Sequence, residues 1–438
     1  MNFSRRDFHK ILGLGLLSFS FPSGGQVNKS EDFPSGVPML QGATSAQSTQ
    51  ISILGLKNSN YKFECYNQSL SLSIHINKIE VHEKDFSDWV IYNLYIENLD
   101  PNYFYELKIV RESDGKFLDN RTFQTLDLNK ENLYWAFGSC MYDGTHKKEI
   151  WQSLQEQNAD FIIFVGDSVY IDRKWGGSKE VSEQRLWGRH VQARLTLDIY
   201  YWQHLKPVFA TWDDHDYGLN NSNRAFVLKH ESQGIFNIFF PFKENVNLTK
   251  GPGVSKKIST NNQDFYLLDN RSFRSEKGAN DEQFFGNDQM SWLESNVNSK
   301  KLSWLMQGSQ WTTTYDRTEN FSKTHPDAFK ETFSRLKSLN APFILCSGDV
   351  HFSEIVNVSE DLLGYKTLEL TSSSFHSRSV PGFNYVFKNK DRIVGTNSNN
   401  YLIINSQFTK TVVTGQINCL SFDKRKSKFL VDLNKVQF

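Results

Sequence analysis

Four runs of apolar residues in this chain end in side chains that can bind metal ions or transfer protons. A thiol follows the first run, and carboxylates, a phenol and imidazoles follow the others. A single residue of this kind near a strand end is usually a cap or a satisfied structural group, but four such ends exceed what capping explains. The stretches are FGSC at 137–140, GDSVYID at 166–172, WDDHDYG at 212–218 and SGDVH at 347–351.

Packing these carboxylates together would be destabilising unless a cation neutralises them, because they repel one another and lose their hydration. The sequence therefore predicts bound metal ions. Their chemistry would be hydrolytic, with a metal-bound hydroxide attacking an electrophile whose oxygens a second ion polarises. A thiolate, a phenolate and a histidine together suit a ferric ion, whereas Asp and Asn oxygens suit calcium or magnesium.

The elements around these stretches predict an α/β fold. Residues 161–165 are an unbroken apolar run, which is typical of a strand buried on both faces. An apolar run at 133–137 and a helical pattern at 147–157 precede it, so the three elements predict a βαβ unit with parallel strands. In such sheets, sites form beyond the carboxyl ends of the strands. We expect further helices at 183–205 and 328–339, and further strands at 207–212 and 342–346.

The segment before these elements has a different pattern. Between residues 37 and 128, short runs such as 51–54 and 89–96 alternate apolar and polar residues with period two, though imperfectly. This pattern predicts an N-terminal β-sandwich domain at 37–128, followed by a catalytic domain at 130–438. Because no polar cluster converges in the sandwich, we expect it to be structural or to gate access to the site.

The N-terminus resembles a twin-arginine export signal. Arg5 and Arg6 precede an apolar run at 11–21 that is too short to cross a bilayer as a helix. We therefore expect a signal peptide at 1–30, recognition by the twin-arginine translocase, and a periplasmic or secreted mature protein. The alternative is a disordered, cleaved or membrane-tethering N-terminus of another type.

The composition bears on whether the chain binds nucleic acid and on how its cysteines are used. The 438 residues include 49 basic and 49 acidic side chains, so the net charge of zero gives no support for specific nucleic-acid binding. The cysteines lie far apart without a CxxC spacing, which argues against a disulfide scaffold and a zinc ribbon.

The chain resembles the alkaline phosphatase D family of calcineurin-like metallophosphoesterases. GDSVYID, WDDHDYG and SGDVH carry the resemblance, and FGSC matches the family's early cysteine motif. It implies a β-sheet sandwich flanked by helices, preceded by a small fibronectin-like sandwich. Ile171 and Asn221 depart from it, since the family often has acidic residues there. Further matches are LDNRSFR at 268–274, GNDQMSWL at 286–293 and LELTSSSFH at 368–376.

The resemblance also implies a mixed site for Fe³⁺ and Ca²⁺, with other divalent ions as alternatives. His215 would protonate the leaving oxygen or stabilise charge in the transition state. Arg271 and Arg274 would clamp phosphate oxygens, although such a pair is about as often a structural ion-pair partner. The implied ligands are Asp167 as a bridge between the metals; Cys140, Tyr170 and His351 on iron; and Asp349, Asn220 and Asp214 at calcium, with Asp214 either a direct ligand or a partner of one.

We therefore predict an exported, metal-dependent hydrolase of a small phosphate ester or phosphodiester. Monoesters and diesters both remain open, including phospholipase D-like and teichoic-acid-like phosphodiester cleavage. A non-catalytic binding protein on the same scaffold is an alternative of another class, but it predicts missing ligands, and no main position is missing. The thiolate–phenolate pair argues against a zinc enzyme. The oligomeric state is not predicted.

Overall fold

The computed structural model describes residues 36–173, 180–313, 319–379, 382, 387–421, 429–433, 436 and 438. The signal predicted at residues 1–30 lies outside the described residues. Within the described ranges, no helix is both long and apolar enough to cross a membrane.

The N-terminal region is all-β, as predicted. Its eight strands form two four-stranded antiparallel sheets, ordered β1-β2-β6-β5 and β4-β3-β7-β8. Buried residues such as Ile51, Leu94, Leu107 and Phe123 form the core of this region. The strands are β1 (Met39–Thr44), β2 (Ser48–Leu56), β3 (Tyr61–Asn67), β4 (Ser73–Ile74), β5 (Lys78–His82), β6 (Trp89–Glu97), β7 (Phe104–Arg111) and β8 (Phe117–Gln124).

Two larger sheets, of six and eight strands, follow in the chain. Their orders are β11-β10-β9-β20-β21-β22 and β12-β13-β14-β15-β16-β18-β17-β19. The strands are β9 (Asn132–Gly138), β10 (Phe161–Val165), β11 (Val208–Thr211), β12 (Leu248–Lys250), β13 (Lys256–Ser259), β14 (Gln263–Leu267), β15 (Leu302–Met306), β16 (Phe343–Ser347), β17 (Ser353–Val358), β18 (Thr367–Thr371), β19 (Arg392–Thr396), β20 (Asn400–Thr409), β21 (Val412–Ser421) and β22 (Phe429–Asp432).

Aromatic side chains join these two sheets face to face. Trp135 of β9 packs edge-on against Trp304 of β15 and Phe265 of β14, with ring centroids 4.9 and 5.0 Å apart. All three rings are fully buried in a cluster that draws on both sheets. The burial of β10 on both of its faces follows from this packing, because helices cover the other side of the sheet.

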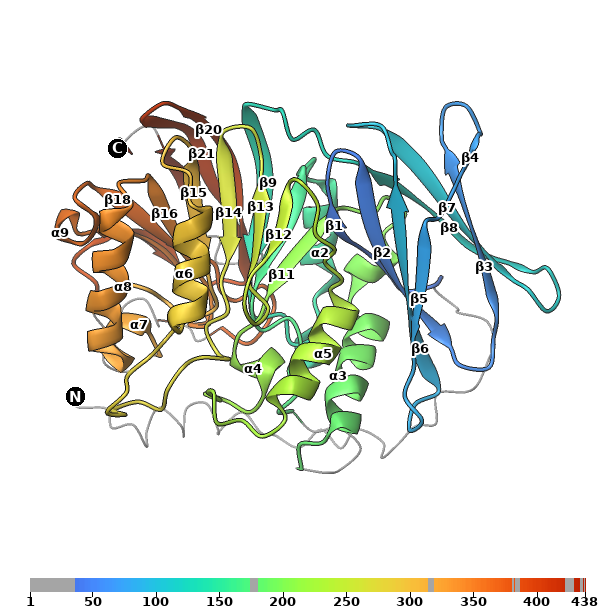
Figure 1. The fold of residues 1–438 in the computed structure, drawn as a ribbon, viewed down its shortest axis with the longest axis horizontal. Helices are drawn as coiled ribbons and strands as arrows, with labels where there is room; N and C mark the ends of the chain where they lie inside the picture. Colours follow the sequence, from blue (N-terminus) through green and yellow to red (C-terminus); the bar gives the residue numbers. More distant parts are fainter. Residues whose placement is uncertain are drawn as a thin grey trace.

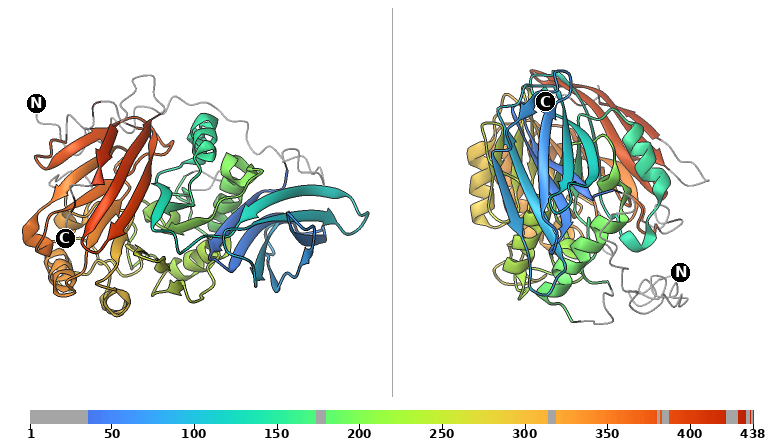
Figure 2. Two further views of the ribbon diagram at one scale, coloured as in Figure 1. Left: turned by 90° about the horizontal axis from the view of Figure 1, so that it is seen from above. Right: turned by 90° about the vertical axis from the view of Figure 1, so that its right-hand side faces the viewer.

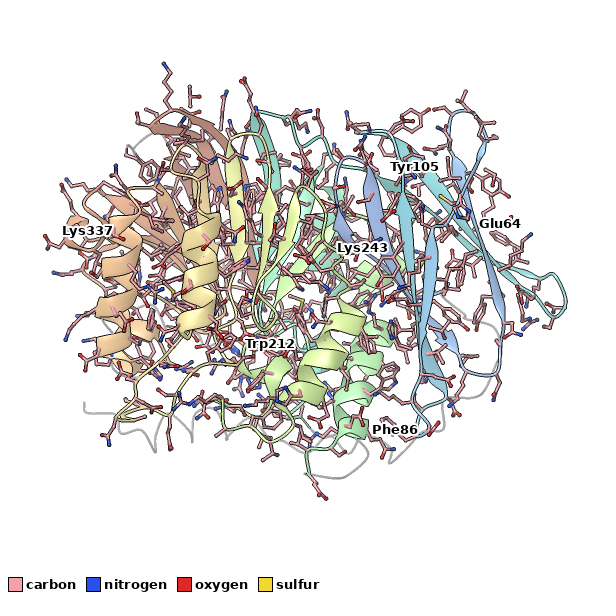
Figure 3. The ribbon with its side chains drawn as sticks, viewed as in Figure 1. Glu64, Phe86, Tyr105, Trp212, Lys243 and Lys337 are labelled. Atoms are coloured by element: carbon pink, nitrogen blue, oxygen red, sulfur yellow. The ribbon has the colours of Figure 1, made fainter. Side chains whose placement is uncertain are left out.

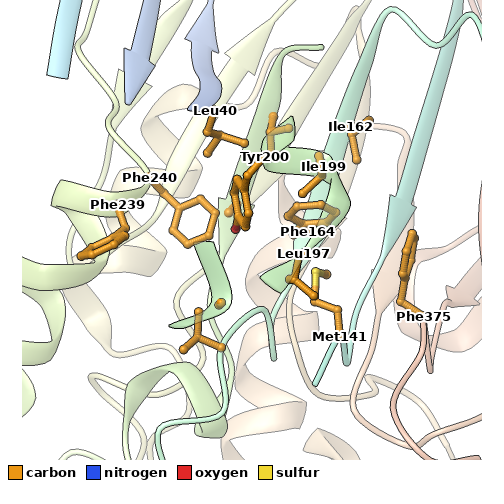
Figure 4. Packing of buried hydrophobic residues seen from close by; sticks show 14 of the residues in the cluster. Leu40, Met141, Ile162, Phe164, Leu197, Ile199, Tyr200, Phe239, Phe240 and Phe375 are labelled. Atoms are coloured by element: carbon orange, nitrogen blue, oxygen red, sulfur yellow. The ribbon is translucent and has the colours of Figure 1, made fainter. Parts of the chain in front are cut away.

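Helices cover the outer faces of both sheets. On the six-stranded sheet, Trp151 of α2, Trp187 of α3 and Phe236 of α5 share a core with Phe164 of β10. Figure 4 shows Phe164 with other members of this core, among them Ile199 and Tyr200. On the eight-stranded sheet, α6 and α8 lie side by side (Figure 1). The helices are α2 (Lys148–Glu156), α3 (Glu183–Thr196), α4 (Asp214–Tyr217), α5 (Lys229–Phe239), α6 (Asn287–Asn296), α7 (Phe321–Thr324), α8 (Pro326–Ser338) and α9 (Glu360–Leu363), with 3-10 turns η1 (Asp143–Thr145) and η2 (Asp198–Tyr201).

The predicted βαβ unit is confirmed: β9 and β10 pair in parallel, and α2 lies between them in the chain. The helix expected at 183–205 is wrong beyond Thr196, where α3 ends. The chain turns there into η2, which buries Ile199 and Tyr200 and places the Tyr200 ring 4.4 Å from the Arg194 guanidinium. This tertiary packing outweighs the helical pattern of the sequence.

The N-terminal sheets lie at one end of the molecule, against α3, α5 and η2 (Figures 1 and 2). Asn93 of β6 donates a hydrogen bond to the carbonyl oxygen of Ile238 at 3.0 Å, and the Trp187 indole donates to Ser87 Oγ at 3.0 Å. These contacts join the β-sandwich to the helices that cover the six-stranded sheet.

Candidate metal centre

The carboxyl ends of β9, β10, β11 and β16 meet where the two large sheets approach each other. The first three strands are parallel neighbours in one sheet, and β16 belongs to the other. Side chains are excluded at two points of close approach: a Cβ at Gly348 would collide with Ser139 Oγ, and one at Gly308 would collide with the Asp213 carboxylate. The residues after each strand therefore face a shared, tightly packed space.

Four of the predicted ligands have left-handed backbone conformations. The φ angles are 59° at Cys140, 55° at Asp167, 66° at Asp349 and 58° at His351. An L residue in this region costs on the order of 1–2 kcal/mol relative to its preferred conformations. Glycine would avoid this cost, so residues with ligand side chains at four such positions indicate a functional constraint.

The structure brings the predicted thiolate, phenolate and bridging carboxylate together. Asp167 Oδ2 lies 3.4 Å from Cys140 Sγ and 3.3 Å from the Tyr170 hydroxyl oxygen. Cys140, Asp167 and His351 each offer a ligand atom, and these atoms lie within 4.8 Å of one another. Cys140, Asp167 and Tyr170 are all buried, so a cation held there would be shielded from solvent.

A second group of carboxylates adjoins the first. Ligand atoms of Asp213, Asp214 and Asp349 lie within 4.8 Å of one another, as do those of Asp167, Asp214 and His215. Asp213 Oδ2 is buried without a hydrogen-bond partner among the described residues. Burial, followed by neighbouring carboxylates, raises the pKa of Asp349 well above its usual range, and burial does the same for Asp167. This concentration of buried acid fits a site for one or more metal ions.

His215 is held by an aspartate from the same loop as Tyr170. Its Nδ1 lies 2.9 Å from Asp172 Oδ1, and its ring stacks on Tyr170 with centroids 4.3 Å apart. Burial lowers the pKa of His215, but Asp214, Asp167 and Asp172 outweigh it and raise the pKa to about 10. Asp172 is the last residue of GDSVYID, and its spacing within that stretch is the signal for it in the sequence.

Arg271 is fully buried and surrounded by protein partners. Its Nε lies 2.5 Å from Asp213 Oδ1, and its Nη1 lies 3.0 Å from Glu319 Oε1. Arg274 also pairs with Glu319. These contacts match the ion-pair alternative for the two arginines, whereas the phosphate clamp stays a prediction. Glu319 was not predicted, because its link to residue 271 appears only in the folded chain.

Asn220 is the predicted ligand that the structure does not place in the buried cluster. It lies in the turn after α4 with its side chain exposed. The neighbouring Asn221 backbone N–H donates to Asp214 Oδ2 at 2.6 Å. His376, the last residue of LELTSSSFH, packs against Trp151 and His146, with ring centroids 5.5 and 5.9 Å away. The role of Asn220 stays a prediction.

The segment that holds the carboxylates together is itself anchored from both sides. Trp212, which follows β11 and is labelled in Figure 3, donates its indole N–H to Asp269 Oδ1 at 2.8 Å. Asp213 caps α4, with its backbone N–H donating to Asp216 Oδ2 at 3.1 Å. Both contacts fix the direction in which Asp214 and His215 leave the strand.

Comparison with known proteins agrees with this geometry. The family model of PhoD-like phosphatases matches residues 135–420, which include the four strand ends. The chain belongs to the PhoD-like phosphatase family. A solved structure of PhoD is similar in fold, with a TM-score of 0.72 and 17% sequence identity, over 92% of this chain and 90% of that one. No curated protein sequence matches the chain.

Membership in the PhoD-like family confirms two predictions in their general form. The fold is the expected mixed α/β arrangement with an all-β N-terminal region. The protein is a metal-dependent phosphatase by family, and its acidic and histidine clusters could bind metal ions. The roles of the individual site residues stay predictions.

Proposed function

We propose that this PhoD-like protein hydrolyses phosphoric esters at an iron–calcium centre. The observation that carries the proposal is the meeting of Cys140, Asp167 and Tyr170 beside the carboxylates of Asp214 and Asp349. Cys140, Asp167, Tyr170 and His351 would hold iron, because thiolate, phenolate and imidazole suit a ferric ion. Asp214 and Asp349 would hold calcium with Asp167 between the ions.

Bound ions would neutralise phosphate oxygens and activate the attacking water. The chain's own contribution is proton transfer and orientation. Asp172 Oδ1 lies at ion-pair distance from His215 Nδ1, so Nε2 would be the nitrogen that gives a proton to the leaving oxygen. The stacking of His215 on Tyr170 fixes the imidazole plane relative to the proposed iron ligand.

The decisive experiment is the hydrolysis of an aryl phosphate monoester and an aryl phosphodiester by wild type, Asp167→Asn and Asp349→Asn, with metal analysis of each preparation. We expect both variants to lose activity and metal. Asp264→Asn is the matched control. Asp264 is a buried aspartate of β14 that lies outside the metal cluster, and its Oδ2 is 3.1 Å from Lys257 Nζ. Full activity in the Asp167 and Asp349 variants would refute the site.

The same preparations decide between the remaining alternatives. Faster turnover of the diester would favour the phospholipase D-like or teichoic-acid-like alternative, and faster turnover of the monoester would favour an alkaline phosphatase. Iron and calcium in the wild-type protein support the proposed ions, whereas zinc alone contradicts them. Bound metal with no turnover of either ester would favour a non-catalytic binding protein.

We also propose that the protein is exported by the twin-arginine translocase. Arg5 and Arg6 before the apolar run at 11–21 support this route. Replacing both arginines with lysine should keep the protein in the cytoplasm of a bacterial host with this translocase. Unchanged export of that variant would contradict the proposal.

A further inference from the structure

The loop at 372–377, which follows β18, lies against the thiol and phenol of the candidate metal centre. Its backbone is tied to the end of β9: Phe375 N–H donates to Ser139 O at 2.8 Å, and Ser377 N–H donates to Cys140 O at 3.0 Å. Ser373 and Ser377 are both buried. The loop therefore holds two hydroxyl groups in fixed positions beside the predicted ligands.

Ser373 bridges two of the proposed iron ligands. Its Oγ accepts a hydrogen bond from the His351 backbone N–H at 2.8 Å and lies 3.2 Å from Cys140 Sγ. A hydroxyl has one proton, and a thiolate can only accept. The Ser373 proton is therefore directed to Sγ when Cys140 is a metal ligand. Ser139 Oγ also lies 3.3 Å from Sγ, but it donates to Ser372 O at 2.8 Å.

Ser377 has the equivalent arrangement at the phenol. Its Oγ accepts from the Tyr142 backbone N–H at 3.0 Å and lies 3.0 Å from the Tyr170 oxygen. A tyrosine that binds a metal as phenolate has no proton to give, so Ser377 must be the donor in this pair. The two serines thus share one pattern: each accepts a backbone N–H and offers its proton to an anionic ligand atom.

We propose that Ser373 and Ser377 are positioning residues that donate hydrogen bonds to the thiolate of Cys140 and the phenolate of Tyr170. Such bonds orient a ligand and reduce the electron density that it gives to the metal. This inference rests on the proposed function, because it requires Cys140 and Tyr170 to be ligands.

The test is the absorption spectrum of the full chain loaded with saturating Fe³⁺ and, separately, Co²⁺. Thiolate and phenolate ligands give charge-transfer bands whose energy rises when a hydrogen bond stabilises the ligand. We expect Ser373→Ala to move the thiolate band, and Ser377→Ala the phenolate band, to longer wavelength. Metal affinity should fall by roughly 10–100-fold in each variant.

Ser372→Ala is the matched control. Ser372 is buried in the same loop, but its hydroxyl donates to the carbonyl oxygen of Phe137 at 3.1 Å. We expect the charge-transfer bands of the metal-loaded Ser372→Ala variant to have the same wavelengths as those of the wild type. Ser373→Thr and Ser377→Thr keep the hydroxyl and should restore the wild-type bands, which separates the hydrogen bond from a general disturbance of the loop.

The outcomes distinguish this inference from the proposed function. If both bands have their wild-type wavelengths in Ser373→Ala and in Ser377→Ala at saturating metal, the role of the serines is overturned and the proposed function is not. The absence of both bands from the wild-type protein with either ion overturns ligation by Cys140 and Tyr170, and the serine role with it. Equal shifts in all three alanine variants also overturn the inference, because they would come from the loop as a whole.

Discussion

Asp172 Oδ1 lies 2.9 Å from His215 Nδ1, and Asp172 belongs to the same loop as Tyr170. Both side chains are mostly buried, so water competes little for either partner. A carboxylate in this position favours the protonated imidazole and limits the orientation of its ring. His215 is thereby restricted to one free nitrogen, Nε2, for proton transfer.

Asp172→Asn should lower kcat by roughly 10–100-fold with little change in KM. The amide has the shape of the carboxylate but lacks the negative charge that faces His215 Nδ1. Steady-state hydrolysis of an aryl phosphate measures this split. Asp198→Asn is the matched control, because Asp198 makes a similar pair with His146 at 2.8 Å away from the carboxylate cluster. Equal rates for wild type and Asp172→Asn would contradict the role of Asp172.

Arg271→Met should destabilise the fold by about 3–5 kcal/mol, because it leaves the buried Asp213 carboxylate without its ion-pair partner. Urea unfolding measures the loss. Arg224→Met is the control, since Arg224 pairs with Asp281 at the surface and such pairs contribute little. A variant that keeps wild-type stability but has a raised KM would instead support the phosphate clamp.

Removing the metal ions should destabilise the protein more at about pH 8 than at about pH 5. The raised pKa values of Asp167 and Asp349 mean that the folded metal-free chain binds more protons than the unfolded chain above about pH 4. Their contribution to stability is therefore lost as the pH rises through the folded-state values. His215, with its pKa raised to about 10, acts in the same direction.

Thermal unfolding with and without chelator at both pH values measures the effect of the metal ions. The metal-loaded protein serves as the control and should depend less on pH, because bound cations replace the missing protons. A chelator effect that is the same at both pH values would contradict the argument.

Much of the fold and site could be predicted from the sequence, because local patterns determine them. The unbroken apolar run at 161–165 is typical of a buried strand, and Asp167 follows it closely, so a place for Asp167 at the sheet edge could be expected. Parallel pairing then brought Cys140 and Asp167 together. The predicted ligands that follow a strand within a few residues were therefore the part of the site that the sequence predicts best.

The rest depended on contacts between distant segments. The ion pair between Arg271 and Glu319 joins the loop that follows β14 to the segment that follows β15, and no spacing in the sequence indicates this contact. Ser377 reaches Tyr170 across 207 positions of the chain. The end of α3 at Thr196 was missed for a related reason, since it reflects the packing of Tyr200 on Arg194 and not a local helix-breaking signal.

Lys256, in β13, is a buried lysine that the proposed chemistry does not use. Its Nζ donates to the carbonyl oxygen of Ala210 at 3.1 Å and lies 5.2 Å from the centre of the Phe236 ring. Burial lowers its pKa to about 7, so above that pH the folded chain releases a proton that the unfolded chain keeps. This group therefore adds stability as the pH rises from about 7 to about 10.

Lys256→Met should remove that pH dependence and stabilise the protein by about 1–4 kcal/mol at pH near 7, because it replaces a buried charge with an apolar side chain of similar length. Urea unfolding of wild type and variant across this pH range measures both effects. Lys148→Met is the control: Lys148 is exposed at the start of α2, so its loss should leave the slope nearly unchanged. A wild-type slope retained in Lys256→Met would assign the pH dependence to other groups.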